Sequence, residues 1–190
     1  MRKIIITIIS ILLLTSVMAQ TPKKVGQDSS RLKAVENYRQ TFWDNPPKHI
    51  KTISDFEYLF TFLEKKQLDT LIRKFEKETS IEIAIITIDT IQSSKEKFDS
   101  LALHVANTWK LGKTEKHYGI LIAITHGNRK MRIENSRGIE ELISDKETKK
   151  IIDNFFIPEF KKDDYFTGTL NGLNELMRLL KQNLKKHNKK

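Results

Sequence analysis

The chain has 190 residues, of which 31% are charged, and it contains no cysteine. This length corresponds to about one domain with tails, which is enough to bury a stable hydrophobic core without disulfide bonds or structural metal ions. The lack of cysteine excludes disulfide bonds, thiol catalysis and a lipoprotein anchor, which requires an acylated cysteine. Glycine and proline are few, so the chain is not of low complexity.

The first 19 residues have the three-part pattern of a secretory signal peptide. Arg2 and Lys3 form a basic start, an apolar run extends from Ile4 to Leu14, and small residues follow at Val17 and Ala19. We expect cleavage near Ala19 and an exported protein, periplasmic or extracellular, with no transmembrane segment in its mature form. The alternative is a membrane anchor, but the apolar run is short for a bilayer span.

The formal net charge of +10 points to negatively charged partners. For an exported chain we expect an envelope protein or an anionic surface, such as acidic lipid headgroups, and no nucleic acid. The other interpretation is that the charge only keeps the protein soluble.

Residues 20–52 are polar and basic without a sustained apolar period, and Pro46 and Pro47 interrupt any helix there. We interpret this range as a basic linker, with Phe42 and Trp43 as residues that could dock on the domain. The domain itself is expected at 53–184. Residues 185–190 form a lysine-rich tail, expected to be frayed and solvated.

Apolar spacing predicts four helices, three of them starting at capping boxes, in which Ser or Thr is followed three positions later by Glu. The predicted boxes are Thr61 with Glu64, Ser93 with Glu96, and Ser144 with Glu147. Gly112 is expected to end the second helix and Pro158 the third. The third helix should bury Ile151, Ile152, Phe155 and Phe156, and the fourth spans about 167–186.

Two runs of branched apolar residues, 81–88 and 118–125, predict strands covered on both faces. A turn at 126–129, with Gly127 and Asn128 suited to positive φ, predicts a hairpin to a third strand at 130–135. Helices between buried strands indicate a crossover, and the hairpin makes the sheet mixed. The predicted fold class is α/β, a three-layer α/β/α sandwich with a small mixed β-sheet flanked by helices.

Several catalytic motifs are absent from the sequence. The LGKT stretch at 111–114 lacks the earlier glycine of a phosphate-binding loop, because Asn107 stands there, and no Gly-x-Ser-x-Gly or His-Glu-x-x-His motif occurs. His104, beside an apolar helix face, is interpreted as a packing residue. Asp89 follows the first long strand, where α/β sheets bind ligands and where turn-forming Asp is also common.

Seven pieces of the sequence match the motifs of one known domain family, in that family's order. They are ISD at 53–55, LFTFLEKKQLDTL at 59–71, KETSIEIAIITI at 77–88, TWKLGK at 108–113, HYGILIAI at 117–124, RKMRIENSRGIEELISD at 129–145 and IPEFKKDDYFTG at 157–168. On these pieces the chain, from about Ile53 to Leu180, resembles the TPM domain family, which is named after a thylakoid lumen protein, a photosystem II repair protein and an animal acetylcholine-receptor modulator.

The resemblance implies an α/β/α sandwich in which acidic residues near the sheet edge bind a divalent metal, often calcium. A phosphatase activity is ascribed to some members. Carried over to this chain, the implied ligands of Ca²⁺ or Mg²⁺ are Asp55, Glu134, Glu140 and Asp145. The residues expected to contact another ligand, such as a phosphate, are Arg132, Arg137 and His117.

The chain departs from the family pattern at these positions. The Asp-Asn-Gly motif reads His117-Tyr118-Gly119, and imidazole is a poor calcium ligand. Arg137 brings a cation into the acidic loop. We therefore expect a weakened metal site or none, and the acids near 145 are equally explained by a helix start, where the dipole favours negative charge.

Two functions follow as hypotheses. The first is an exported, soluble TPM-domain protein that acts as a binding or accessory module in the cell envelope. The alternative is a metal-dependent acid phosphatase, in which the ion would polarise a phosphoryl oxygen. A third and weaker possibility is that the lysine-rich tail binds an anionic membrane.

Overall fold

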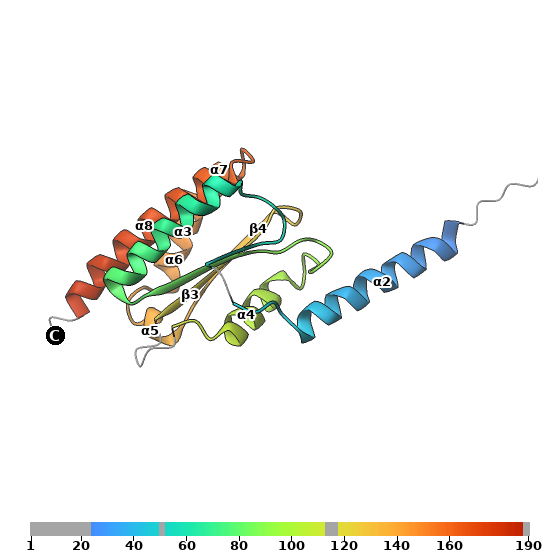
Figure 1. Cartoon of the computed structure of the whole chain (residues 1–190), viewed down its shortest axis with the longest axis horizontal. Helices are drawn as coiled ribbons and strands as arrows, with labels where there is room; N and C mark the ends of the chain where they lie inside the picture. The colour runs from blue at the N-terminus through green and yellow to red at the C-terminus, as the bar shows by residue number, and fades with distance from the viewer. Residues whose placement is uncertain (1–23, 50–51, 113–117, 188–190) are drawn as a thin grey trace, which may run out of the picture. The chain divides into compact units, whose positions relative to one another are not determined.

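The computed structural model describes residues 24–49, 52–112 and 118–187 (Figure 1). The chain divides into two compact units, Met1–Asn37 and Tyr38–Lys190. Helix α2, Lys24–Asp44, occupies much of the range expected as a linker, so that range is partly helical. Phe42, at its end, is buried in the second unit, as the docking interpretation allowed. The predicted signal peptide lies outside the described residues.

A four-stranded mixed sheet forms the middle layer of the second unit, with the order β1-β2-β3-β4. Its strands are β1 (Ile53–Asp55), β2 (Glu82–Thr87), β3 (Gly119–Thr125) and β4 (Lys130–Asn135). The first three run parallel, and β4 returns antiparallel to β3, which confirms the predicted mixed sheet. Strand β1 was not predicted, because three residues are too few to show a period.

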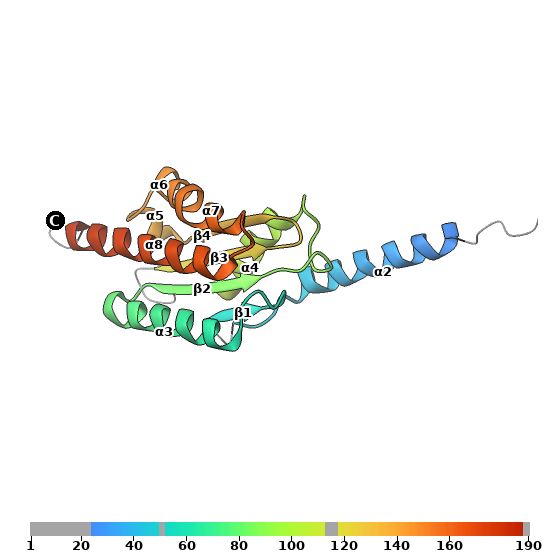
Figure 2. The same cartoon turned by 90° about the horizontal axis from the view of Figure 1, so that it is seen from above.

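Helices cover both faces of this sheet, as Figures 1 and 2 show. They are α3 (Phe62–Thr79), α4 (Phe98–Trp109), α5 (Arg137–Glu140), α6 (Asp145–Ile151), the π-helix η1 (Ile152–Phe156), α7 (Ile157–Phe160) and α8 (Tyr165–His187). Residues of α3, α6 and α8 share one hydrophobic cluster, and residues of α4 share the other. The three-layer α/β/α sandwich is therefore confirmed.

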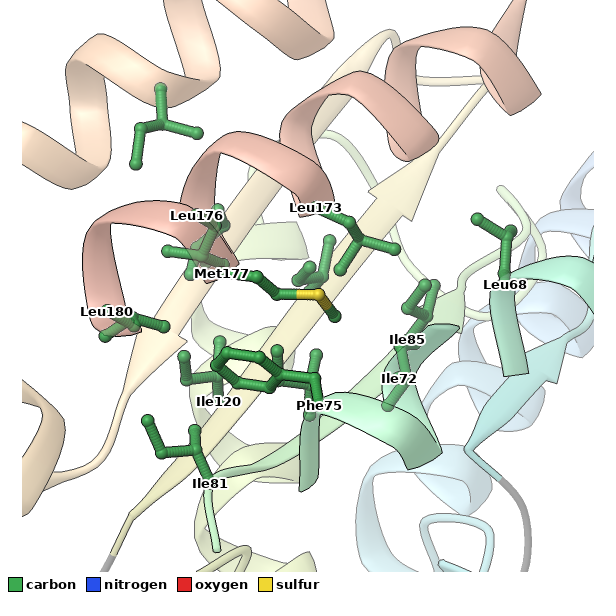
Figure 3. Packing of buried hydrophobic residues seen from close by; sticks show 14 of the residues in the cluster. Leu68, Ile72, Phe75, Ile81, Ile85, Ile120, Leu173, Leu176, Met177 and Leu180 are labelled. Carbon is green, nitrogen blue, oxygen red and sulfur yellow. The ribbon is translucent and has the colours of Figure 1, made fainter. Parts of the chain in front are cut away.

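The two clusters arise because side chains along a strand alternate between the faces of the sheet. In β2, Ile83 and Ile85 join the α3–α8 side, whereas Ala84 and Ile86 join the α4 side. Figure 3 shows the first cluster, in which the ring of Phe75 lies among apolar side chains from the sheet and from α8. Both faces of the central strands therefore need apolar residues, which explains their continuous apolar runs.

The first and third predicted capping boxes are confirmed. The Thr61 hydroxyl accepts the Glu64 N–H, and the Glu64 carboxylate accepts the Thr61 N–H at 2.7 Å. Ser144 and Glu147 make the same reciprocal pair at the start of α6. Each box satisfies two backbone donors that the first helical turn leaves without partners.

The second capping box, Ser93 with Glu96, is wrong. Helix α4 begins only at Phe98, and Ser93 is buried with its hydroxyl donating to the Ser94 carbonyl. The reason lies in the preceding turn, where the Asp89 carbonyl accepts the N–H groups of Gln92 and Ser93. This turn holds Ser93 inside the fold and prevents it from capping a helix.

Two left-handed residues differ from those expected. Lys110, with φ of 49°, ends α4 in place of Gly112, and Arg129, with φ of 49°, completes the hairpin turn in place of Gly127 or Asn128. Gly112 still needs its positive φ of 74°, and a side chain there would overlap the backbone of Tyr118. Composition indicates that a turn exists, but not which residue adopts the strained conformation.

Pro158 does not end the third helix, contrary to expectation. The helix passes through the π-helical turn Ile152–Phe156 and continues as α7, with Pro158 in the first turn of α7. Proline has no N–H to donate, so it is tolerated where the hydrogen-bond pattern changes. Of the four residues expected to face inward, Ile151 and Phe156 are buried, and Ile152 and Phe155 are partly buried.

The Phe156 ring packs directly on Gly172 of α8, where an added Cβ would overlap it. Replacing Gly172 with alanine should therefore lower the free energy of unfolding by about 1–3 kcal/mol through overpacking. The matched control is Asn171→Ala, an exposed neighbour on the same helix, which should change stability by at most about 0.5 kcal/mol. Urea denaturation measures both, and equal stability of the two variants would contradict this packing.

Candidate functional site

A pocket of about 830 Å³ lies between the end of α4, the start of β3, the end of β4 and α5. We call it the α4–α5 pocket. Its walls carry apolar, amide and charged side chains, and they are formed by Leu103, Ala106, Asn107, Lys110, Leu111, Gly112, Gly119, Leu121, Glu134, Asn135, Ser136, Arg137 and Glu140.

Side chains bound to backbone N–H groups fix the walls of this pocket. The Glu82 carboxylate accepts the Gly112 N–H at 2.7 Å, and the Ser136 hydroxyl accepts the Gly119 N–H at 2.8 Å. Both bonds join loops to strand ends, so they hold the rim of the pocket to the rigid sheet. A preorganised rim lowers the entropic cost of binding.

Both signs of charge meet in the α4–α5 pocket. Lys110 and Arg137 contribute cations, and Glu134 and Glu140 contribute carboxylates. The Arg132 guanidinium donates to the Glu134 carboxylate, whose side chain is only 11% exposed. Arg132 and Glu134 lie two residues apart on β4 and therefore share one face of the sheet. Part of the negative charge in the pocket is thus already compensated by the protein.

Asp55 lies at the end of β1, and its side chain is only 2% exposed. Its carboxylate accepts hydrogen bonds from the Leu59 N–H at 3.0 Å, the Phe60 N–H at 3.2 Å and the Thr87 hydroxyl at 2.8 Å. The Lys65 ammonium lies at 3.4 Å. The carboxylate therefore joins two strands and the loop that enters α3, and its oxygens are occupied by protein donors.

The structure does not bring the four predicted metal ligands together. The pairing register from β1 across the sheet to β4 places Asp55 level with Met131. Glu134 lies three residues further along β4, and β4 is the edge of the sheet opposite β1. Strand spacing and rise then place Asp55 about 17 Å from Glu134. Asp145 is the first residue of α6 and does not line the pocket. Of the four, Glu134 and Glu140 share the α4–α5 pocket.

Of the residues expected to contact another ligand, Arg137 lines the pocket, and Arg132 contacts it through Glu134. His117 lies outside the described residues. Within residues 24–49, 52–112 and 118–187, no group of three or more His, Asp or Glu side chains is arranged to hold a metal ion.

A carboxylate that was not predicted, Glu57, lies at the opposite end of the sheet from the pocket. It accepts the backbone N–H groups of His126 at 2.8 Å and Gly127 at 3.1 Å, which ties the β1 loop to the hairpin. Burial raises the pKa of Glu57, these two bonds lower it, and the charge of Asp89 raises it further. No motif marks Glu57 in the sequence, because its partners are backbone groups.

The interpretations of His104 and Asp89 agree with the structure. The His104 ring stacks on Trp43 at 4.4 Å between centroids, and its Nε2 lies 2.8 Å from the Trp43 carbonyl. The Asp89 carboxylate accepts the Ile91 N–H at 2.8 Å, as in a turn. Both residues therefore have structural partners.

A sequence model described as the TPM domain matches residues 53–179. The chain belongs to the TPM domain family. No curated protein matches it. The helices of the described residues include none whose length and apolar character would suit a membrane crossing.

Solved TPM-domain structures share this fold. The N-terminal domain of a P. gingivalis protein, solved by NMR, has 21% identity and a TM-score of 0.62, with 71% of this chain and 85% of that chain covered. The BA42 protein from the psychrophilic bacterium Bizionia argentinensis has 24% identity and a TM-score of 0.59, with 67% and 86% covered. At these identities the likeness concerns the fold.

The bonds of Asp55 predict a structural role for its carboxylate. Asp55→Asn keeps one carbonyl oxygen and leaves at least one buried donor unpaired, so it should lower the free energy of unfolding by about 1–3 kcal/mol. The control Asp153→Asn alters an exposed ion pair with Lys149 and should cost at most about 1 kcal/mol. Urea unfolding should give the same loss with and without EDTA. A loss that appears only in the presence of calcium would identify Asp55 as a metal ligand instead.

Proposed function

We propose that this TPM-domain chain is an exported binding module that recognises a protein partner of the cell envelope through the α4–α5 pocket. The observation that carries the proposal is the pocket itself, whose lining includes two cations, Lys110 and Arg137, and two carboxylates, Glu134 and Glu140. A surface with both charges suits a polypeptide segment that presents both signs of charge, since complementary charges give specificity.

Export is part of this proposal and rests on the N-terminal sequence. The basic start, the apolar run and the small residues before Gln20 support cleavage after Ala19. A mature form that begins at Gln20 and accumulates in the envelope fraction is the expected product. The surface positive charge would then face anionic envelope components.

A resident calcium or magnesium ion has little support from the side chains of the pocket. Calcium prefers six to eight oxygen ligands. Glu134 and Glu140 line the pocket, but the Glu134 carboxylate is bound by Arg132, and Arg137 adds a further cation. These residues do not fit a tightly held divalent ion, and the proposed binding function requires none.

Photocrosslinking in the native host tests the proposed pocket. A photoreactive phenylalanine analogue at Leu103, which lines the pocket and is 46% exposed, should give one discrete adduct with an envelope protein. The matched control is the same analogue at Ile91, which is 50% exposed and outside the pocket. We expect Arg137→Glu to abolish the adduct by reversing a pocket charge. Equal adducts from both positions would contradict the proposal.

The alternative that the resemblance implies, a metal-dependent phosphatase, makes a different prediction. Of the residues that the resemblance implies, Glu140 and Arg137 line the pocket. In that case Glu140 would be one of the ligands of the ion and Arg137 would bind the phosphate. We expect instead that any hydrolysis of p-nitrophenyl phosphate is unchanged by EDTA and by Glu140→Gln. Activity that both treatments remove, and that Mg²⁺ restores in the parent protein, would favour the phosphatase.

A further inference from the structure

Strand β1 forms an edge of the sheet, and some of its backbone groups have no strand partner within the described part of the chain. Strand β1 is the last strand in the order β1-β2-β3-β4 of the described sheet. The Ile85 N–H donates to the Thr52 carbonyl at 2.8 Å, and Ile53 pairs in parallel with Ile85. In a parallel pair of strands, only every second residue of a strand hydrogen-bonds to a given neighbouring strand. In β1 the backbone N–H and C=O groups of Ile53 and Asp55 therefore point away from β2.

Strand β1 and helix α3 lie side by side (Figure 2). Residues of both line a groove of about 500 Å³ beside this edge. Phe62, Lys66, Asp69 and Arg73 form its helical wall. Their spacing of four, three and four residues is that of one face of a helix. The eleven steps along the helix from Phe62 to Arg73 span about 16 Å, which is the length of about five extended residues. The groove therefore has the dimensions of a short added strand.

The charges of this groove favour an acidic occupant. Its cations are Lys65, Lys66 and Arg73, and its acids, Asp55 and Asp69, already have protein partners. Arg73 donates to Asp69 at 2.8 Å. Burial raises the pKa of the Asp69 carboxyl, but the bonds from Arg73 and Thr52 and the charge of Arg73 together lower the pKa below its usual value. Lys66 has no side-chain partner among the described residues. An arriving carboxylate would therefore find an available ammonium group and no free carboxylate.

Large apolar side chains stand exposed at the start of α3. Tyr58 is 85% exposed, Phe62 77% and Leu63 73%. Tyr58 also has a φ of 55°, a left-handed conformation that is costly for an aromatic residue. Such a patch next to a groove commonly marks a protein–protein contact.

We propose that the β1–α3 groove binds an extended acidic segment of a partner protein, which adds to β1 as a fifth strand. Its backbone pairs with Ile53 and Asp55, its carboxylates lie against Lys66, and an apolar residue contacts Phe62 and Leu63. This is recognition by strand addition, in which backbone bonds give affinity and side chains give specificity. The groove is separate from the α4–α5 pocket, and the inference does not depend on that pocket.

An amide NMR titration tests this proposal with defined probes. The probe is an acetylated, amidated heptapeptide that alternates glutamate and valine and ends in phenylalanine. The comparison peptides are its lysine-for-glutamate analogue and a version methylated on every backbone nitrogen. We expect saturable shifts at Ile53, Asp55 and Lys66 with the first peptide, and binding about tenfold weaker or absent with the other two.

Two charge-reversal variants of the protein distinguish binding in the β1–α3 groove from nonspecific electrostatic attraction. Lys66→Glu should weaken the acidic peptide about tenfold, whereas Lys74→Glu, the same charge change off the groove on the same helix, should have less than about a twofold effect. Unchanged amide spectra outside the substituted turn confirm that both variants fold.

The proposal is overturned by flat spectra, by equal binding of the methylated or basic peptide, or by shifts centred on the α4–α5 pocket. Self-association through β1 without peptide, detected by light scattering, would also overturn it. Since Lys66→Glu leaves the α4–α5 pocket intact, crosslinking from position 103 reports on the proposed function separately.

Discussion

The fold depends on one constraint, the burial of β2 and β3 on both faces. Side chains from Ile83 to Thr87 and from Gly119 to Thr125 are almost entirely inaccessible to solvent. Two buried faces require apolar residues at successive positions and a helical layer on each side. Polar and charged side chains are consequently excluded from the middle of the sheet and lie at the ends of the strands. Asp55, Thr87 and Glu57 occupy one end, and the α4–α5 pocket occupies the other.

The same constraint explains how much of the fold could be predicted. The apolar runs located β2 and β3 to within about one residue at each end, because burial on both faces leaves a continuous pattern. Helices α3 and α6 were located by capping boxes that lead directly into an apolar period. The box at Ser93 failed because the Asp89 turn competes for the same residues. Strand β1 is defined by its pairing with β2, which its three residues do not encode locally.

The candidate site was less predictable than the fold, since it depends on strand order. Asp55 and Glu134 belong to motifs of one family, but they lie on opposite edge strands of the sheet. They also lie at different heights along the strands. Only the assembled register reveals this separation. The Arg132 bond to Glu134 could be anticipated from their spacing of two on a strand. The role of Glu57 could not, because it binds the backbone of a hairpin about seventy positions away.

The two carboxylates at the C-terminal ends of the parallel strands differ in environment. Asp55 is bound by a hydroxyl, two N–H groups and an ammonium, whereas Glu57 is bound by two N–H groups and lies near the negative charge of Asp89. For Glu57 the effect of burial outweighs that of the two N–H bonds, so the pKa of its carboxyl is raised. A carboxyl whose pKa is raised in the folded protein stabilises the fold at pH values below its pKa in the unfolded chain. This stabilisation is lost as the pH rises through its pKa in the folded protein.

The π-helical turn at Ile152–Phe156 has a consequence for comparing this chain with its relatives. The buried residues Thr148, Ile151, Phe156 and Phe160 follow at intervals of three, five and four, so the turn absorbs one residue beyond an α-helical repeat. Each α-helical residue turns the chain by about 100°. A relative with a plain α-helix here would keep the same buried face with one residue fewer. An alignment gap of a single residue therefore belongs inside this helix rather than in the loops that flank it.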